Sequence, residues 1–214
     1  MNNIIKVEAD REGISSEKIR HFLATFFQGK TRDADCYLDQ FTDIDIERIR
    51  ALTRKRLRSL LVDIDACIAP AYDEILPQNL QKIEELLDEG VRIGIYSNCK
   101  ALDRLNPLFE LGIPFYDGHL AKPQAEGFLA ACRTFDFDPK ETWMVGENPN
   151  TDGGAVNVLE GMIFVKPIPD NLSKLSLAKR IRLPFQVLFR NLAIYATLRD
   201  NDTIIRSHHL HTIQ

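Results

Sequence analysis

Two aspartates that are separated by one residue, Asp63 and Asp65, lie at the end of an apolar run. Burying carboxylates in such a place is costly, so the pair predicts a functional site rather than a solvated turn. One carboxylate of such a pair can attack an electrophile while the other moves protons. The chemistry that this spacing favours is nucleophilic catalysis assisted by a general acid and base.

Five more polar residues stand at comparable points, after an apolar run or before a helix-like segment: Ser97, Asn98, Lys122, Glu147 and Asp152. Carboxylates gathered at one site need a cation, and hard oxygen ligands suit Mg²⁺. A serine hydroxyl and a lysine ammonium can bind the oxygens of a phosphoryl group. Together the residues predict magnesium-dependent phosphoryl transfer through an aspartyl phosphate.

The elements that must position these residues begin at residue 59, where short apolar runs alternate with helix-like segments. The predicted strands are 60–64, 91–96, 113–116, 142–145 and 162–165, and the predicted helices are 77–89, 101–111, 124–135 and 153–160. This alternation predicts βαβ units, hence a Rossmann-like three-layer α/β/α domain with a parallel sheet over residues 59–168. Ligands bind at the carboxyl ends of such strands, where the polar residues would gather.

The two flanking segments are predicted to be helical extensions. Residues 1–58 form the N-terminal extension, and residues 169–214 form a basic amphipathic C-terminal segment. From position 166 onward the chain has eight basic and three acidic residues, whereas the net charge of the whole chain is -4. An acidic body that carries a basic tail does not predict a nucleic-acid-binding protein, but the tail suits contact with an anionic surface.

Composition sets the broad class. The chain has 214 residues, of which 44% are hydrophobic and 27% charged, so a globular domain with a buried core is expected and general disorder is excluded. Its four cysteines contain no C-x-x-C pair, which argues against a zinc site or a disulfide scaffold. No signal-peptide pattern or membrane-spanning run is present, so we expect a cytoplasmic protein, peripheral to a membrane if the tail binds one.

At these residues the sequence resembles the haloacid dehalogenase-like (HAD) superfamily of phosphohydrolases. Its four motifs occur in order over residues 59–168: Asp63-Ile64-Asp65-Ala66-Cys67, Tyr96-Ser97-Asn98, Lys122-Pro123, and Gly146-Glu147 with Thr151-Asp152. Four short motifs in order, each at a predicted strand end or helix start, are far more specific than any one of them.

The resemblance implies a role for each matched residue. Asp63 would be the nucleophile, and Asp65 the general acid and base, with its backbone carbonyl on the metal. The substrate phosphate would be held by Ser97, Asn98 and Lys122. Glu147 and Asp152 would complete the Mg²⁺ site.

Many members of this superfamily insert a cap domain between the first two motifs or between the second and third. Here Asp63 and Ser97 are 34 residues apart and Ser97 and Lys122 are 25 apart, enough for one helix and one strand each. We therefore expect no cap, and an open site that suits large or surface-bound substrates.

Within the capless group, the sequence is similar to the branch of YqeG-like proteins and mitochondrial phosphatidylglycerophosphate phosphatases. This likeness rests on Cys67, on Pro70 and on the fourth motif, which is followed by Gly154 and Asn157. It implies phosphatidylglycerophosphate as the substrate. The sequence departs from the family pattern at Ala66, at Ala121 before the motif lysine, and at Glu147.

Alternatives remain open at this point. The substrate could instead be a phosphoprotein or a small phosphometabolite. The chain could also be a degenerate HAD-fold protein that binds or regulates without turnover, as Ala66, Cys67 and Glu147 suggest. The C-terminal helix could lie in a membrane interface, with Lys179, Arg180, Arg182 and Arg190 near lipid phosphates, or pack on the core or another chain.

Overall fold

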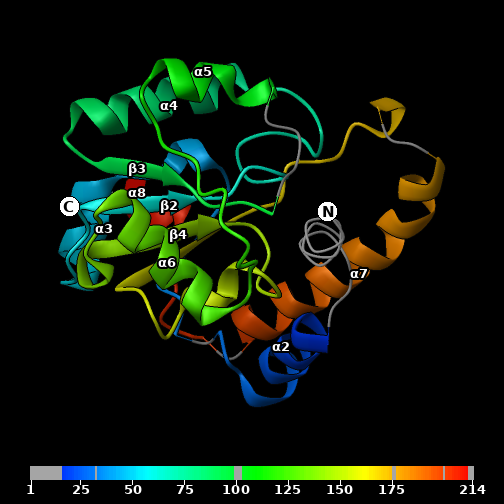
Figure 1. Cartoon of the computed structure of the whole chain (residues 1–214). Helices are drawn as coiled ribbons and strands as arrows, with labels where there is room; N and C mark the ends of the chain where they lie inside the picture. Colours follow the sequence, from blue (N-terminus) through cyan, green and yellow to red (C-terminus); the bar gives the residue numbers. More distant parts are fainter. Residues whose placement is uncertain (1–15, 32, 99–102, 175–176, 200, 212–214) are drawn as a thin grey trace.

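A computed structural model describes residues 16–31, 33–98, 103–174, 177–199 and 201–211. At its centre lies a six-stranded sheet in the order β3-β2-β4-β5-β1-β6, in which every neighbouring pair is parallel (Figure 1). The strands are β1 (Cys36–Leu38), β2 (Ser59–Val62), β3 (Arg92–Ile95), β4 (Thr142–Gly146), β5 (Gly161–Val165) and β6 (Ile205–Arg206). The predicted Rossmann-like parallel sheet is confirmed.

Helices cover both faces of this sheet. They are α2 (Ser16–Gln28), α3 (Ile46–Thr53), α4 (Pro77–Asp88), α5 (Asn106–Glu110), α6 (Ala125–Phe135), α7 (Leu177–Arg199) and α8 (Ser207–His211). Successive strand residues point to opposite faces, so Leu60 and Val62 join one buried cluster and Leu61 joins the other. The first cluster includes residues of α3, α4 and α5, and the second is built on α6, which gives the predicted three layers.

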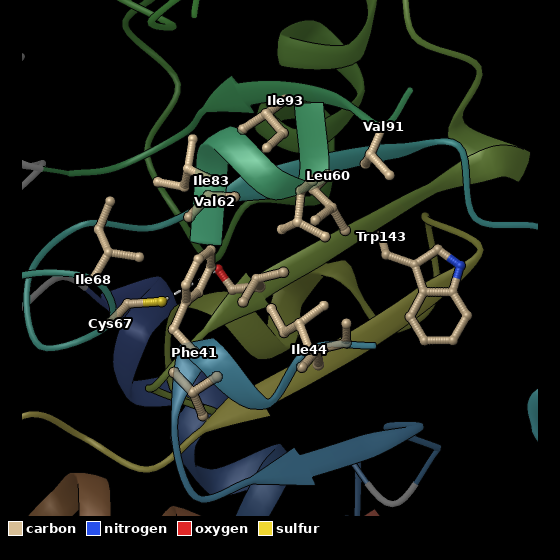
Figure 2. Packing of buried hydrophobic residues seen from close by; sticks show 14 of the residues in the cluster. Phe41, Ile44, Leu60, Val62, Cys67, Ile68, Ile83, Val91, Ile93 and Trp143 are labelled. Carbon is tan, nitrogen blue, oxygen red and sulfur yellow. Dashed lines mark hydrogen bonds between the residues drawn. The ribbon is translucent and has the colours of Figure 1, made fainter. Parts of the chain in front are cut away.

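The larger cluster forms the main core (Figure 2). Phe41 and Ile44 pack here with side chains of β2 and β3, and the indole of Trp143 closes one end. The Trp143 Nε1–H donates to the carbonyl of Arg56 at 2.7 Å, so its one polar atom is satisfied. Cys67 also points into this cluster, where its thiol is buried and lies 3.9 Å from the carbonyl of Val145.

Three predicted elements are shorter than expected. The helix predicted over 101–111 is the turn η2 (Asp103–Leu105) followed by α5, and residues 101–102 lie outside the described ones. Residues 113–116 make only an isolated bridge, Phe115 with Ile95, because Pro114 has no amide hydrogen for a ladder. The helix predicted over 153–160 is a single turn, η4 (Asp152–Ala155). Its sequence begins Asp-Gly-Gly, and consecutive glycines disfavour a longer helix.

The flanking segments are not purely helical, contrary to expectation. β1 lies within 1–58 and β6 within 169–214, and both join the sheet beside β5. Strands of three and two residues are too short to show the alternation of apolar and polar residues that marks a strand in a sequence. Their pairing is decided by partners far along the chain, since Cys36 lies beside both Ile163 and Ile205.

α2 and α7, from opposite ends of the chain, pack side by side (Figure 1). The rings of Phe22 and Phe189 meet edge to face with their centroids 5.0 Å apart. His21 on α2 is buried, and its Nε2–H donates to the carbonyl of Pro149 at 2.9 Å. The helix pair is thereby attached to the loop after β4. None of the helices in the described ranges is both long and apolar enough to cross a membrane.

His21 makes folding stability dependent on pH. Burial, with the nearby Lys30 charge, lowers the pKa of His21 from 6.5 to about 4. The unfolded chain therefore takes up a proton first as pH falls, so stability is full above pH 6.5 and is lost between 6.5 and 4, by up to about 3 kcal/mol.

We expect His21→Gln, measured by urea unfolding at pH 7 and pH 4.5, to have a smaller stability difference between the two pH values than the wild type. The glutamine amide can still donate to the Pro149 carbonyl but takes up no proton. The control is His119→Gln, at an exposed histidine. An equal pH dependence in the His21 variant and the wild type would contradict this assignment.

Candidate active site and metal centre

The site is built at the carboxyl ends of β2, β3 and β4. In the sheet, Val62 lies between Ile95 and Val145, so the residues that follow these three strands meet at one edge. The hydrogen-bond ladder between β2 and β4 continues one residue beyond the end of β2, because the Asp63 amide donates to the Val145 carbonyl at 2.9 Å. The structure thus brings Asp63, Ser97 and Glu147 to one edge, as the sequence predicts.

Lys122 lies between two aspartates. Its Nζ is 2.8 Å from Asp63 Oδ2 and 2.5 Å from Asp152 Oδ1, and its side chain is only 1% exposed. Burial by itself favours the neutral amine, but the Asp152 and Asp63 carboxylates outweigh it and raise the pKa of Lys122 above its ordinary value. Lys122 is therefore a fixed positive charge beside the predicted nucleophile.

Asn98 holds the backbone that carries this lysine. Its Oδ1 accepts from the Lys122 amide at 3.1 Å, and its Nδ2 donates to the Lys122 carbonyl at 3.4 Å. Both atoms of the side-chain amide are thus engaged with the main chain, and the side chain positions Lys122. Phosphate binding by Asn98 stays a prediction. Ser97, predicted to bind phosphate, is buried at the end of β3.

Asp63, Glu147 and Asp152 form a buried acidic group. A carboxylate oxygen from each lies within 4.8 Å of the others. Gly146 permits this approach, because a Cβ at that position would lie 2.3 Å from the Asp152 carboxyl carbon. Asp63 Oδ1 and Glu147 Oε2 are buried and find no hydrogen-bond partner in the described part of the chain. Two unsatisfied carboxylate oxygens facing a third carboxylate fit a divalent cation.

Crowding raises the pKa of two residues of this group, Glu147 and Asp152. Burial, together with Asp152 and Asp63, raises the pKa of Glu147 well above its usual range. Burial also raises the pKa of Asp152 to about 6, although Lys122 opposes this and the Asn148 amide donates to Asp152 Oδ2 at 3.0 Å. Lys122 and Arg190 together do not balance three carboxylates, so a bound cation would relieve the remaining repulsion.

Asp65 stands apart from this acidic group. Its Oδ1 accepts from Arg104 Nη2 at 2.5 Å and from the Tyr72 amide at 3.1 Å. Burial raises the pKa of Asp65, while the Arg104 charge acts in the opposite direction. Its predicted metal contact is through the backbone carbonyl and stays a prediction. Arg104 is not marked in the sequence, because no motif includes a basic residue seven positions after Ser97.

A second arginine reaches the site from α7. The Arg190 guanidinium lies 4.0 Å from Glu147 Oε1, and its Nε is buried without a partner in the described residues. Arg190 is one of the basic residues that would lie near lipid phosphates if α7 lay in a membrane interface, but the structure places it beside a candidate metal ligand. α7 also meets this loop where Asn150 Nδ2 donates to the Phe189 carbonyl at 3.2 Å.

Comparison with known families agrees with this geometry. The model of the haloacid dehalogenase-like hydrolases matches residues 2–157, well over half of the chain. The chain belongs to the haloacid dehalogenase-like hydrolase family. Within the family fold this hydrolase has no cap domain: the described residues between β2 and β3 form one loop and α4, and those between β3 and Lys122 form the turn η2 (Asp103–Leu105) and α5.

Several solved structures are also similar to this hydrolase. One is the cobalt-bound deoxy-D-mannose-octulosonate 8-phosphate phosphatase from Haemophilus influenzae, with 15% identity, a TM-score of 0.42, and coverage of 50% of this chain and 67% of that chain. Another is a hypothetical protein from Xanthomonas campestris, with 13% identity, a TM-score of 0.45, and coverage of 72% and 90%. No match is found among curated proteins.

If Glu147 is a metal ligand, replacing it should raise the stability of the metal-free protein and lower its affinity for Mg²⁺. Glu147→Gln removes a buried carboxylate that is repelled by Asp63 and Asp152, so the metal-free protein gains about 1 kcal/mol. The same change weakens Mg²⁺ binding at least about 10-fold, because an amide oxygen is a poorer ligand than a carboxylate. Thermal unfolding with EDTA and with increasing Mg²⁺ measures both effects.

The matched control is Glu141→Gln. Glu141 pairs with Arg56 and Arg58 before β4, at the far end of the strand from Glu147. This variant should keep the Mg²⁺-dependent rise in melting temperature. Mg²⁺ stabilising the Glu147 variant as strongly as the wild type would exclude Glu147 from the metal site.

Proposed function

We propose that this hydrolase is a magnesium-dependent phosphomonoesterase that acts through an aspartyl phosphate on Asp63. One observation carries the proposal: Asp63 Oδ2 is held by Lys122, while Asp63 Oδ1 is unpartnered among the described residues and lies beside Glu147 and Asp152. A carboxylate with one oxygen anchored and the other unbound, next to a cation-binding group, is suited to attack an anionic phosphoryl group.

The reaction would have two steps. In the first, an Asp63 oxygen attacks phosphorus, the bond from phosphorus to the leaving oxygen breaks, and protonated Asp65 gives its proton to that oxygen. In the second, the Asp65 carboxylate takes a proton from water, and the water oxygen attacks the aspartyl phosphate. The bond from phosphorus to Asp63 then breaks, which releases inorganic phosphate and restores both aspartates.

Each surrounding residue supports these steps in a different way. Asp63, Glu147 and Asp152 would hold the Mg²⁺, which when bound neutralises charge on the phosphoryl oxygens. Lys122 supplies a second positive charge from the protein side, and the Ser97 hydroxyl would bind a phosphoryl oxygen. Cys67 points into the core, so its thiol is not among the groups at the site.

The test is hydrolysis of p-nitrophenyl phosphate in the presence of Mg²⁺. We expect steady turnover by the wild type and a loss of at least about 1,000-fold in Asp63→Asn, since the amide is not a nucleophile. Asp88→Asn, at an exposed residue at the end of α4, is the control and should keep full activity. Mg²⁺ binding without turnover of any phosphomonoester would favour the alternative, a HAD-fold binding protein.

We further propose that the substrate is a phospholipid head group at a membrane surface, phosphatidylglycerophosphate by resemblance to the YqeG-like and mitochondrial branch. The surface of the helix pair supports this proposal. On α7, Leu177, Ile181 and Phe185 are 75%, 62% and 64% exposed, and on α2 Phe27 is 74% exposed. α7 contains no acidic residue and five basic ones, of which Arg190 lies beside Glu147. Exposed apolar side chains with basic neighbours suit an anionic bilayer interface.

Vesicle sedimentation tests the membrane contact. We expect the wild type to sediment with phosphatidylglycerol vesicles at low salt, much less at high salt, and not with phosphatidylcholine vesicles. The double variant Ile181→Ser with Phe185→Ser should bind at least about 10-fold more weakly, because it loses two apolar side chains. Phe109→Ser on α5, at another exposed phenylalanine, is the control. No sedimentation of the wild type at low salt would refute membrane binding.

A further inference from the structure

Arg104 connects the segment after Ser97 to the loop that carries Asp65. It lies in η2 (Asp103–Leu105), and its side chain is only 8% exposed. One end of the guanidinium, Nη2, is 2.5 Å from Asp65 Oδ1. The other, Nη1, donates to the carbonyls of Asp73 at 2.9 Å and Pro70 at 3.4 Å. A single planar group thus fixes both the carboxylate and the backbone of loop 65–73.

These contacts fix the orientation of the Asp65 carboxyl group. Oδ1 has two donors, Arg104 and the Tyr72 amide, whereas Oδ2 accepts no hydrogen bond from the described residues. The side chain is 28% exposed, so Oδ2 can meet a substrate or a water molecule. A group that transfers protons needs one oxygen held and one accessible, which is the arrangement here.

We propose that Arg104 is a positioning residue for proton transfer, holding Asp65 so that its second oxygen exchanges protons with the leaving group and then with water. This inference rests on the proposed phosphatase function. Arg104 would act through Asp65 and touch no substrate atom. Without Arg104 the carboxyl group would rotate, and the loop 65–73 would lose its ties to η2, so the proton donor would be misplaced while the nucleophile, Lys122 and the acidic group stay in place.

Leaving-group chemistry separates this role from a merely structural one. An alkyl phosphate expels a strongly basic alkoxide and needs a proton from Asp65, whereas p-nitrophenyl phosphate expels a weakly basic phenolate and needs little help. We expect Arg104→Gln to lower kcat/KM about 100-fold for glycerol 3-phosphate and less than about 10-fold for p-nitrophenyl phosphate. The ratio of the two values does not depend on how much protein is folded, so partial unfolding cannot produce the effect.

Two further variants complete the experiment. Arg104→Lys keeps the positive charge and should recover part of the activity on the alkyl phosphate. Arg92→Gln is the matched control, because the Arg92 guanidinium also donates to two carbonyls, of Asp136 at 2.7 Å and Phe135 at 2.9 Å. Arg92 begins β3, at the opposite end of the sheet from the site, so its loss should leave the ratio between the substrates unchanged.

The outcomes distinguish this inference from the function on which it rests. If the wild type hydrolyses both phosphates and Arg104→Gln slows both by the same factor, the role of Arg104 is refuted and the phosphatase function stands. If the wild type hydrolyses neither phosphate, the phosphatase function fails and the role of Arg104 fails with it. A selective loss on the alkyl phosphate, partly restored in Arg104→Lys, supports the inference.

Discussion

The buried ammonium group of Lys122 lies between Asp63 and Asp152, where water is almost excluded. Without it, three carboxylates would face one another at low dielectric, a cost of several kcal/mol for each uncompensated charge. Other features of the site serve this contact: the Asn98 amide fixes the lysine backbone, and Gly146 leaves room for Asp152. Lys122 and Arg190 against three carboxylates still leave the site negative, which makes it receptive to a divalent metal.

The sequence was sufficient to predict the parts of this site that depend on the sheet alone. Asp63, Ser97 and Glu147 each follow a buried strand, and a parallel sheet brings such positions together whatever the helices do. Arg104 and Arg190 could not be predicted in this way. They belong to segments whose placement follows from tertiary packing, and a basic residue in such a segment usually faces solvent. β1 and β6 could not be predicted because each pairs with residues that are far away in the sequence.

The flanking helices α2 and α7 provide one wall of the site, and the described part of this hydrolase contains no cap domain. α2 reaches the loop after β4 through His21, and α7 reaches it through Phe189 and Arg190. The same helix pair exposes its apolar side chains on the surface. A ligand bound to the exposed face of these helices would therefore lie on elements that contact the loop that carries Glu147 directly. If this surface binds the substrate-bearing membrane as proposed, recognition and chemistry would be connected without an inserted domain.

The position of β1 in the sheet determines the order in which the protein can assemble during synthesis. β1 is translated early, yet its neighbours β5 and β6 follow more than a hundred residues later. β2 pairs with β3 on one side and β4 on the other, and neither pairing involves β1. A ribosome-bound chain can therefore align Asp63, Ser97 and Glu147 first. β1 then inserts between β5 and β6, and a chain that stops short of β6 leaves β1 as an open edge for association with other chains. The residues that carry the proposed chemistry can thus align before β1 joins the sheet, and the two-residue β6 gives the finished sheet a shorter edge than the three-residue β1 would.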